Sequence, residues 1–194
     1  MPAASRLAIC FCLGAAVGTL LDGIHLYGDV ESYPDPVFGR WAWFVPLEFG
    51  AAGALAGALI PRLERAVGPA EPPRWGALAR LAELAVLVAA YLSTVVLADV
   101  PAVATALLLV LLAARLTRPV RGDWAYALAG ALAGPAAEIV ISATGAFDYA
   151  DPDIAGIPLW LPALWANGGI FIRRLLGPVV YPSRSSTSPP SDPT

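Results

Sequence analysis

Two segments of this chain, 116 residues apart, repeat the same pattern of glycines, prolines and acids. The first contains Tyr33-Pro34-Asp35-Pro36 and the second contains Tyr149-Ala150-Asp151-Pro152. Without a gap, the same offset pairs further residues: Gly14 with Gly130, Gly18 with Gly134, Asp22 with Glu138, Pro46 with Pro162, Phe49 with Trp165 and Gly53 with Gly169. A register kept over this length indicates a duplicated two-helix unit. We therefore expect functional residues where the two copies face each other.

The composition places this unit in a membrane. The chain is 58% hydrophobic and only 14% charged, whereas soluble domains carry about 25% charged residues. Six apolar stretches are bounded by charge, proline or glycine: 7–27, 41–60, 81–97, 101–116, 124–142 and 157–175. About 20 helical residues cross a bilayer core, and none of these stretches alternates as barrel strands do. We predict an all-α integral membrane protein with six transmembrane helices, in which helices 1–2 and 5–6 form the duplicated hairpin.

The arginines predict the orientation of the helices. Eleven of the twelve lie near the termini or between helices two and three or four and five: Arg6, Arg62, Arg65, Arg74, Arg80, Arg115, Arg118, Arg121, Arg173, Arg174 and Arg184. The positive-inside rule then places both termini in the cytoplasm. A signal peptide at 7–21 is the alternative, but this stretch is in register with an internal helix. We expect a transmembrane domain at 1–180 and a disordered cytoplasmic tail at 181–194, rich in serine and proline.

Ionisable groups within the predicted helices mark a candidate site, because they are costly in hydrocarbon. At about 1.5 Å per residue, Asp22, Glu48 and Glu138 fall in one layer below the outer surface. His25 lies on the face of Asp22, about one turn further out, and Asn167 is nearer the midplane. A purely structural role, in which the acids are protonated and join the helices, is the alternative.

Other kinds of site are not expected. His25 is the one histidine and suits an interfacial hydrogen bond better than a metal site. We expect no metal, no cofactor, no catalytic residue and no nucleic-acid partner. GxxxG pairs such as Gly53 and Gly57 can pack helices of two copies together, so a homo-oligomer remains an alternative.

The last two helices carry a family resemblance. Gly145-Ala146-Phe147-Asp148-Tyr149-Ala150-Asp151-Pro152-Asp153 is followed by Trp160-Leu161-Pro162 and by Gly168-Gly169. This spacing resembles that of the Insig (insulin-induced gene) proteins, as does Trp43-Phe44-Val45-Pro46 with Gly50 and Pro61 in the second helix. The resemblance extends over about residues 6–176 and suggests a bacterial-type homologue, since the chain is rich in alanine and arginine and has no lysine.

The resemblance implies a membrane lipid sensor. Insig proteins of eukaryotes bind oxysterols and then retain Scap and HMG-CoA reductase in the endoplasmic reticulum. An aspartate that the family needs for Scap binding has no counterpart in residues 116–119, so a Scap-type partner is not expected here. Asp22, His25 and Glu48 replace uncharged residues of the family. What the resemblance transfers is the fold and lipid binding.

The resulting functional hypothesis is an Insig-like sensor or regulator of the bacterial cytoplasmic membrane. Its bundle would hold a diacylglycerol- or sterol-like lipid at a site that includes Asp22, His25, Glu48, Glu138, Asn167, Trp160 and Pro162. One alternative is an intramembrane isomerase or hydratase that uses the carboxyls as acid and base. A proton-coupled transporter is a weaker alternative, because the repeats are parallel.

Overall fold

The computed structural model describes residues 1–67, 76–117, 120 and 122–181, and within them it contains six helices and one short strand pair. The helices are α1 (Ala3–Tyr27), α2 (Val45–Val67), α3 (Ala77–Val96), α4 (Pro101–Leu116), α5 (Asp123–Ser142) and α6 (Leu161–Val180), and the strands are β1 (Glu31–Ser32) and β2 (Asp148–Tyr149). The number and order of helices agree with the prediction. From residue 182 on, the expected tail lies outside the described residues.

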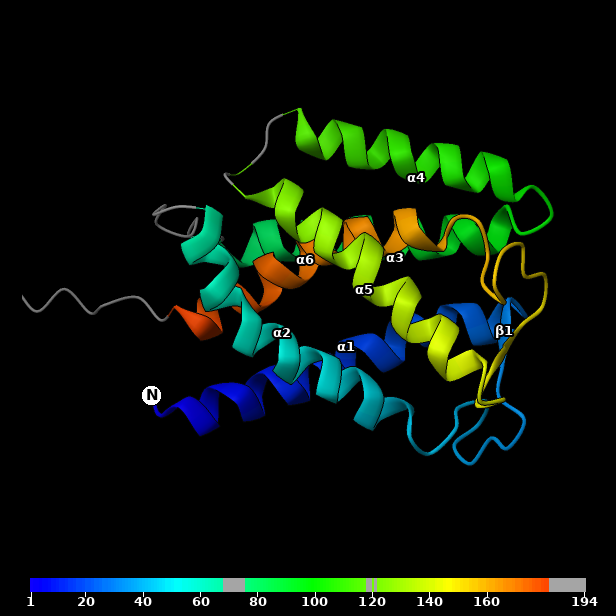
Figure 1. Ribbon diagram of the computed structural model, residues 1–194, viewed down its shortest axis with the longest axis horizontal. Helices are drawn as coiled ribbons and strands as arrows, with labels where there is room; N and C mark the ends of the chain where they lie inside the picture. Colours follow the sequence, from blue (N-terminus) through cyan, green and yellow to red (C-terminus); the bar gives the residue numbers. More distant parts are fainter. Residues whose placement is uncertain (68–75, 118–119, 121, 182–194) are drawn as a thin grey trace, which may run out of the picture.

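The helices form a bundle that has the strand pair at one end (Figure 1). The chain begins at the other end, where α6 also finishes, and α4 lies on the outside of the bundle. By length and composition alone, α1, α3 and α5 are apolar enough to cross a membrane, and α4 is a shorter apolar helix. The more polar α2 and α6 carry charged residues that are buried inside the bundle, such as Glu64 and Arg173.

The two hairpins make the same contacts at corresponding positions. A Cβ added to Gly14 of α1 would meet the backbone of Phe49 and Gly53 in α2. At the equivalent positions, a Cβ on Gly130 of α5 would meet the backbone of Trp165 and Gly169 in α6. Small residues let helix backbones approach closely in membranes, and the repeated glycines therefore set how each hairpin packs.

The strand pair lies where the two copies meet. β1 and β2 are antiparallel, with Ser32 opposite Asp148 and Glu31 opposite Tyr149. A shift of 116 residues exchanges Ser32 with Asp148, so this pair maps onto itself, as residues beside a twofold axis do. The connecting loops agree too, because the isolated bridge Phe38–Trp41 corresponds to the bridge Ile154–Ile157.

Pro46 and Pro162 begin helices and do not bend them. A proline inside a helix bends it, but each of these is the second residue of α2 or α6. In the first helical turn the missing N–H has no intrahelical partner in any case. The chain therefore turns before these prolines, at 41–44 and 157–160.

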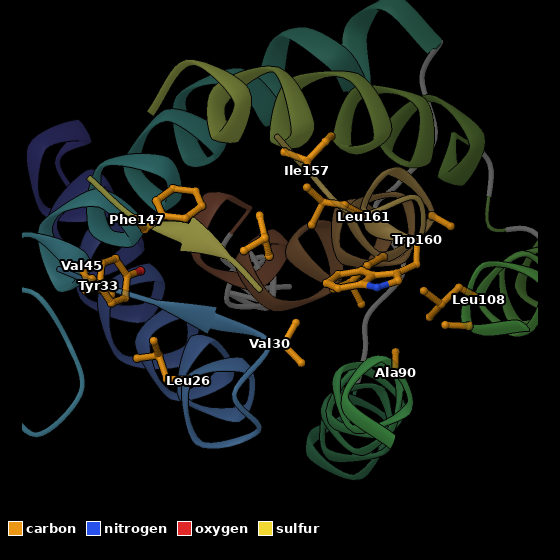
Figure 2. Packing of buried hydrophobic residues seen from close by; sticks show 14 of the residues in the cluster. Leu26, Val30, Tyr33, Val45, Ala90, Leu108, Phe147, Ile157, Trp160 and Leu161 are labelled. Carbon is orange, nitrogen blue, oxygen red and sulfur yellow. The ribbon is translucent and has the colours of Figure 1, made fainter. Parts of the chain in front are cut away.

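The main hydrophobic core lies at the strand end of the bundle (Figure 2). Tyr33 and Phe147, from corresponding ends of the two hairpins, pack edge to face at 6.1 Å. Trp160, Leu108 and Ala90 bring the start of α6, α4 and α3 into the same cluster. This core fixes the loops next to the buried polar residues of α1 and α5.

Candidate functional site

Four carboxyl groups interact electrostatically at the strand end of the bundle, and we call them the carboxyl cluster. Asp22 of α1, Glu48 of α2 and Glu138 of α5 were predicted to share a layer, and each acts on its neighbours. Glu31 of β1 is the fourth, and it is only 6% exposed. Burial, together with the nearby Asp22 and Glu138, raises the pKa of Glu31 well above its ordinary value.

Sequence reasoning missed Glu31, because acids in loops are normally solvated. The one available signal was the repeat, since the offset of 116 residues places Phe147 at the position of Glu31. A position that is aromatic and buried in one copy is a candidate for burial in the other.

Each hairpin holds its acid with a tyrosine from the following loop. The Tyr33 hydroxyl donates to Asp22 Oδ1 at 3.3 Å, and the equivalent Tyr149 hydroxyl donates to Glu138. Glu138 also accepts from Trp165 Nε1 at 2.5 Å. The acids are therefore hydrogen-bonded within their own repeats, which satisfies part of the cost of burying them.

His25 joins α1 to α3 and lies apart from the carboxyls. Its Nε2 is 2.9 Å from Thr94 Oγ1, and its ring stacks on Tyr91 with centroids 4.7 Å apart. The Trp160 ring is also close, with its centroid 5.2 Å from that of His25. Among the residues that the structure describes, no group of three His, Cys, Asp or Glu could hold a metal ion.

Asn167 lies on the side of α6 that faces α4. Its Nδ2 donates to the carbonyl oxygens of Leu108 at 3.1 Å and Ala163 at 2.9 Å. Arg115 donates to both its carbonyl and side-chain oxygens. An arginine near the end of a membrane helix commonly extends its charged end toward water, but the Arg115 side chain is buried and pairs with Glu83. An internal partner offsets the desolvation of the guanidinium and makes the turn inward favourable.

The two motif residues of the α6 start differ in burial. Trp160 is buried and packs on Tyr149 and His25. Pro162 is exposed, so its position suits helix initiation and gives it no place in an enclosed site.

An apolar cavity of about 80 Å³ lies between α1, α2, α3 and α6. Its wall contains residues of both hairpins, including the equivalent Phe49 and Trp165, and also the small Gly168. None of the seven predicted site residues lines this cavity. It adjoins the carboxyl cluster through Trp165, which lines it and donates to Glu138. It also adjoins His25 through Tyr91, which lines it and stacks on the His25 ring.

A second polar group was not foreseen, and we call it the ion-pair network. It joins five helices through three arginines and three acids: Glu64 of α2, Glu83 of α3, Arg115 of α4, Asp123 of α5, and Arg173 and Arg174 of α6. Asp123 is fully buried and accepts from both Arg173 and Arg174. The network has equal numbers of positive and negative groups, which suits a structural role.

Comparisons with known proteins agree with this fold. A family model described as a protein of unknown function, DUF2878, matches residues 80–179. Insulin-induced gene 1 protein of Danio rerio is 25% identical over 180 residues, which cover 88% of this chain and 70% of that protein. Both findings are consistent with the family resemblance seen in the motifs.

Solved structures give the same result. A crystal structure of MvINS, a mycobacterial Insig homologue from Mycobacterium vanbaalenii, matches with a TM-score of 0.77 and 26% identity, covering 93% of this chain and 97% of that one. A cross-linked trimer of MvINS matches with a TM-score of 0.75 and 27% identity, covering 91% and 94%. The predicted all-α membrane fold is thereby confirmed.

Proposed function

The chain belongs to the DUF2878 family and is an Insig-like membrane protein, and from this premise we propose that it binds a lipid between α1, α2, α3 and α6 and acts as a lipid sensor or regulator. The observation that carries the proposal is the apolar cavity inside the bundle, adjoining the carboxyl cluster. Ligand sites are typically apolar clefts with a few convergent polar groups.

The size of the cavity supports a sensing role. At about 80 Å³, the cavity is smaller than the roughly 300–1,000 Å³ of typical ligand pockets. We therefore expect the helices that line it to move apart when a lipid enters. Binding would then favour the wider arrangement of the bundle, and such a shift is how a ligand changes the state of its protein.

The charge of the cluster supports an uncharged polar end on the ligand. Four carboxyls lie together, and the ion-pair network holds the buried arginines elsewhere. A phosphate would be repelled by any ionised carboxyl, whereas a hydroxyl can hydrogen-bond to the acids. A diacylglycerol- or sterol-like lipid fits both the apolar wall and these acceptors.

The same groups would also suit an intramembrane lipid isomerase or hydratase, since Asp22 and Glu138 are each paired with a tyrosine. Mass spectrometry of lipids that copurify with the protein separates the two functions. A stoichiometric lipid that is unchanged on incubation supports the sensor, a converted product supports the enzyme, and the absence of any bound lipid contradicts both.

Filling the cavity should abolish lipid binding. A Cβ on Gly168, which lines the cavity, would meet no atom within 4 Å, so Gly168→Leu should place its side chain in the cavity without disrupting the fold. Gly177 has equally open surroundings but does not line the cavity, and Gly177→Leu is the matched control. Copurified lipid per protein should fall at least about fivefold in the first variant only; equal lipid content in both would exclude this cavity.

Amide substitutions test the role of the carboxyl cluster. Asp22→Asn, Glu48→Gln and Glu138→Gln keep the shape of each group and remove its charge. In a sensor, each should change lipid affinity by a few-fold; in an enzyme, the essential acid should cost about 10²-fold or more in turnover. Lipid titration and product assays on the same preparations measure both. Unchanged binding and the absence of a dependent activity would leave the acids with a structural role.

We further propose a bacterial cytoplasmic membrane location with both termini inside. The arginine distribution supports it, although Arg74, Arg118, Arg121 and Arg184 lie outside the described residues. Single cysteines at the exposed Ser32 or Asp151 should react with an impermeant reagent added to cells, and a cysteine at the exposed Arg65 should react only after lysis. The reverse pattern would invert the topology.

We also propose that the protein forms a homo-oligomer. It is supported by the crystal structure of a cross-linked MvINS trimer, which matches 91% of this chain. Native mass spectrometry of the protein released from detergent would give the number of copies, and a strictly monomeric mass would exclude the proposal.

A further inference from the structure

Tyr91 of α3 brings a hydroxyl group to the wall of the apolar cavity. Among the lining residues that the structure describes, Trp165 is the one other residue with a polar side-chain group. Its Nε1 is already used, because it donates to Glu138. The Tyr91 hydroxyl makes no hydrogen bond with any described residue, and it is therefore the polar group that the cavity can offer to a ligand.

The other tyrosines inside the bundle use their hydroxyls within the protein. Tyr33, Tyr126 and Tyr149 are buried, and each donates to a carboxyl group. A tyrosine hydroxyl inside a protein usually has such a partner, because its removal from water otherwise costs free energy. Tyr91 is partly buried and differs from these three, so a partner from outside the chain would recover the cost.

The Tyr91 ring is held in position by its neighbours. It stacks on the His25 ring with centroids 4.7 Å apart. The Thr94 hydroxyl donates its one proton to the Tyr91 carbonyl oxygen at 2.7 Å, so His25 Nε2 is the donor in its 2.9 Å hydrogen bond with Thr94 Oγ1. This bond fixes the imidazole, and the stack then fixes the direction of the Tyr91 ring before a ligand arrives.

Tyr91 lies at the polar end of the cavity. α3 runs toward the strand end of the bundle (Figure 1), and Tyr91 is one turn further along it than Leu87, the other α3 residue of the wall. Tyr91 also interacts electrostatically with Asp22, Glu31 and Glu138 of the carboxyl cluster. The lining residues toward the opposite end are all apolar. A lipid in the cavity would therefore place its polar end beside Tyr91.

We propose that the Tyr91 hydroxyl donates a hydrogen bond to an uncharged oxygen at the polar end of the bound lipid, and that His25 is the positioning residue that holds Tyr91 in place. The oxygen can be an ester carbonyl or a hydroxyl, and a ligand hydroxyl can also donate to a carboxyl of the cluster. The proposal rests on the lipid-binding function proposed above, and it adds the residue that selects lipids with such an oxygen.

Titration of the detergent-solubilised protein with dioleoylglycerol and with squalene, a lipid without oxygen, tests this role. Tyr91→Phe removes the hydroxyl and keeps the ring that stacks on His25. It should weaken dioleoylglycerol binding by about three- to tenfold, as expected for one neutral hydrogen bond, and leave squalene binding unchanged. Tyr27→Phe is the matched control, because Tyr27 is exposed and does not line the cavity; it should change both affinities by less than about twofold.

A second measurement asks whether the hydroxyl has a partner within the protein. In delipidated protein, Tyr91→Phe should leave the free energy of unfolding unchanged or raise it, because no internal hydrogen bond is lost. Tyr149→Phe should lower it, because the Tyr149 hydroxyl donates to Glu138. An equal loss of stability in the two variants would show an internal partner for Tyr91 and overturn the proposal.

A parallel titration with cholesterol identifies the oxygen. A loss of affinity in Tyr91→Phe for dioleoylglycerol alone indicates an ester carbonyl, a loss for cholesterol alone indicates a sterol hydroxyl, and a loss for both indicates the hydroxyl that they share. Weaker binding of squalene as well would mean a structural effect and overturn the proposal. Unchanged binding of both oxygen-containing lipids would also overturn it, while a loss of binding in Gly168→Leu would still support the lipid-binding function. If neither lipid binds the unaltered protein, both proposals are wrong.

Discussion

Replacing Arg173 by alanine should destabilise the folded bundle by about 3–5 kcal/mol, the usual cost of breaking a buried ion pair by removing one partner. Arg173 donates to Glu64 at 2.8 Å and to Asp123 at 2.7 Å. Its guanidinium also lies over the Tyr126 ring, 4.9 Å from the centroid. The variant leaves two buried carboxylates without this partner, in a bundle whose interior offers little water to replace it.

Unfolding of purified protein in mixed micelles, titrated with denaturing detergent, measures this loss. The matched control is Arg62→Ala, because Arg62 is exposed and its side chain bonds a carbonyl of its own helix. The control should change the free energy of unfolding by less than about 1 kcal/mol. Equal effects of the two substitutions would show that the ion-pair network contributes little to stability.

The ion-pair network also shows where sequence reasoning failed. Hydropathy ended the sixth helix near residue 175 and placed Arg173 and Arg174 in a cytoplasmic flank, where arginines are expected to be solvated. In the structure α6 continues to Val180 and carries both arginines into the bundle. Their acidic partners come from three other helices, and a hydropathy window along one sequence does not detect pairing between helices.

The carboxyl cluster was partly predictable. The rise per residue of a helix was enough to bring Asp22, Glu48 and Glu138 to one depth, and the three do interact. The apolar cavity nevertheless lies beside them, with Trp165 as the link. Which face of each helix lines a cavity depends on helix crossing, and that is fixed by packing and not by depth.

The repeated register was the most informative part of the sequence, because residues that it pairs occupy equivalent positions in the structure. Gly14 and Gly130 occupy equivalent positions at the two helix crossings, each against a backbone oxygen, of Phe49 and Trp165 respectively. In an ordinary helix, glycine to alanine is favourable by roughly 0.5–1 kcal/mol. At these two helix crossings, we expect glycine to alanine to be unfavourable instead.

We expect Gly14→Ala and Gly130→Ala each to destabilise the bundle by about 1–3 kcal/mol, the range for overpacking a well-packed site. The added methyl group would meet a helix backbone, which cannot rotate away as a side chain can, so the two helices of a hairpin would have to separate. Gly177→Ala is the control, since a Cβ there meets nothing within 4 Å, and it should leave stability unchanged or raise it. Denaturing-detergent titration of all three variants gives the comparison. Similar losses at both crossings are what two equivalent hairpins require, whereas a loss at one crossing alone would mean that the hairpins contribute unequally despite their shared register.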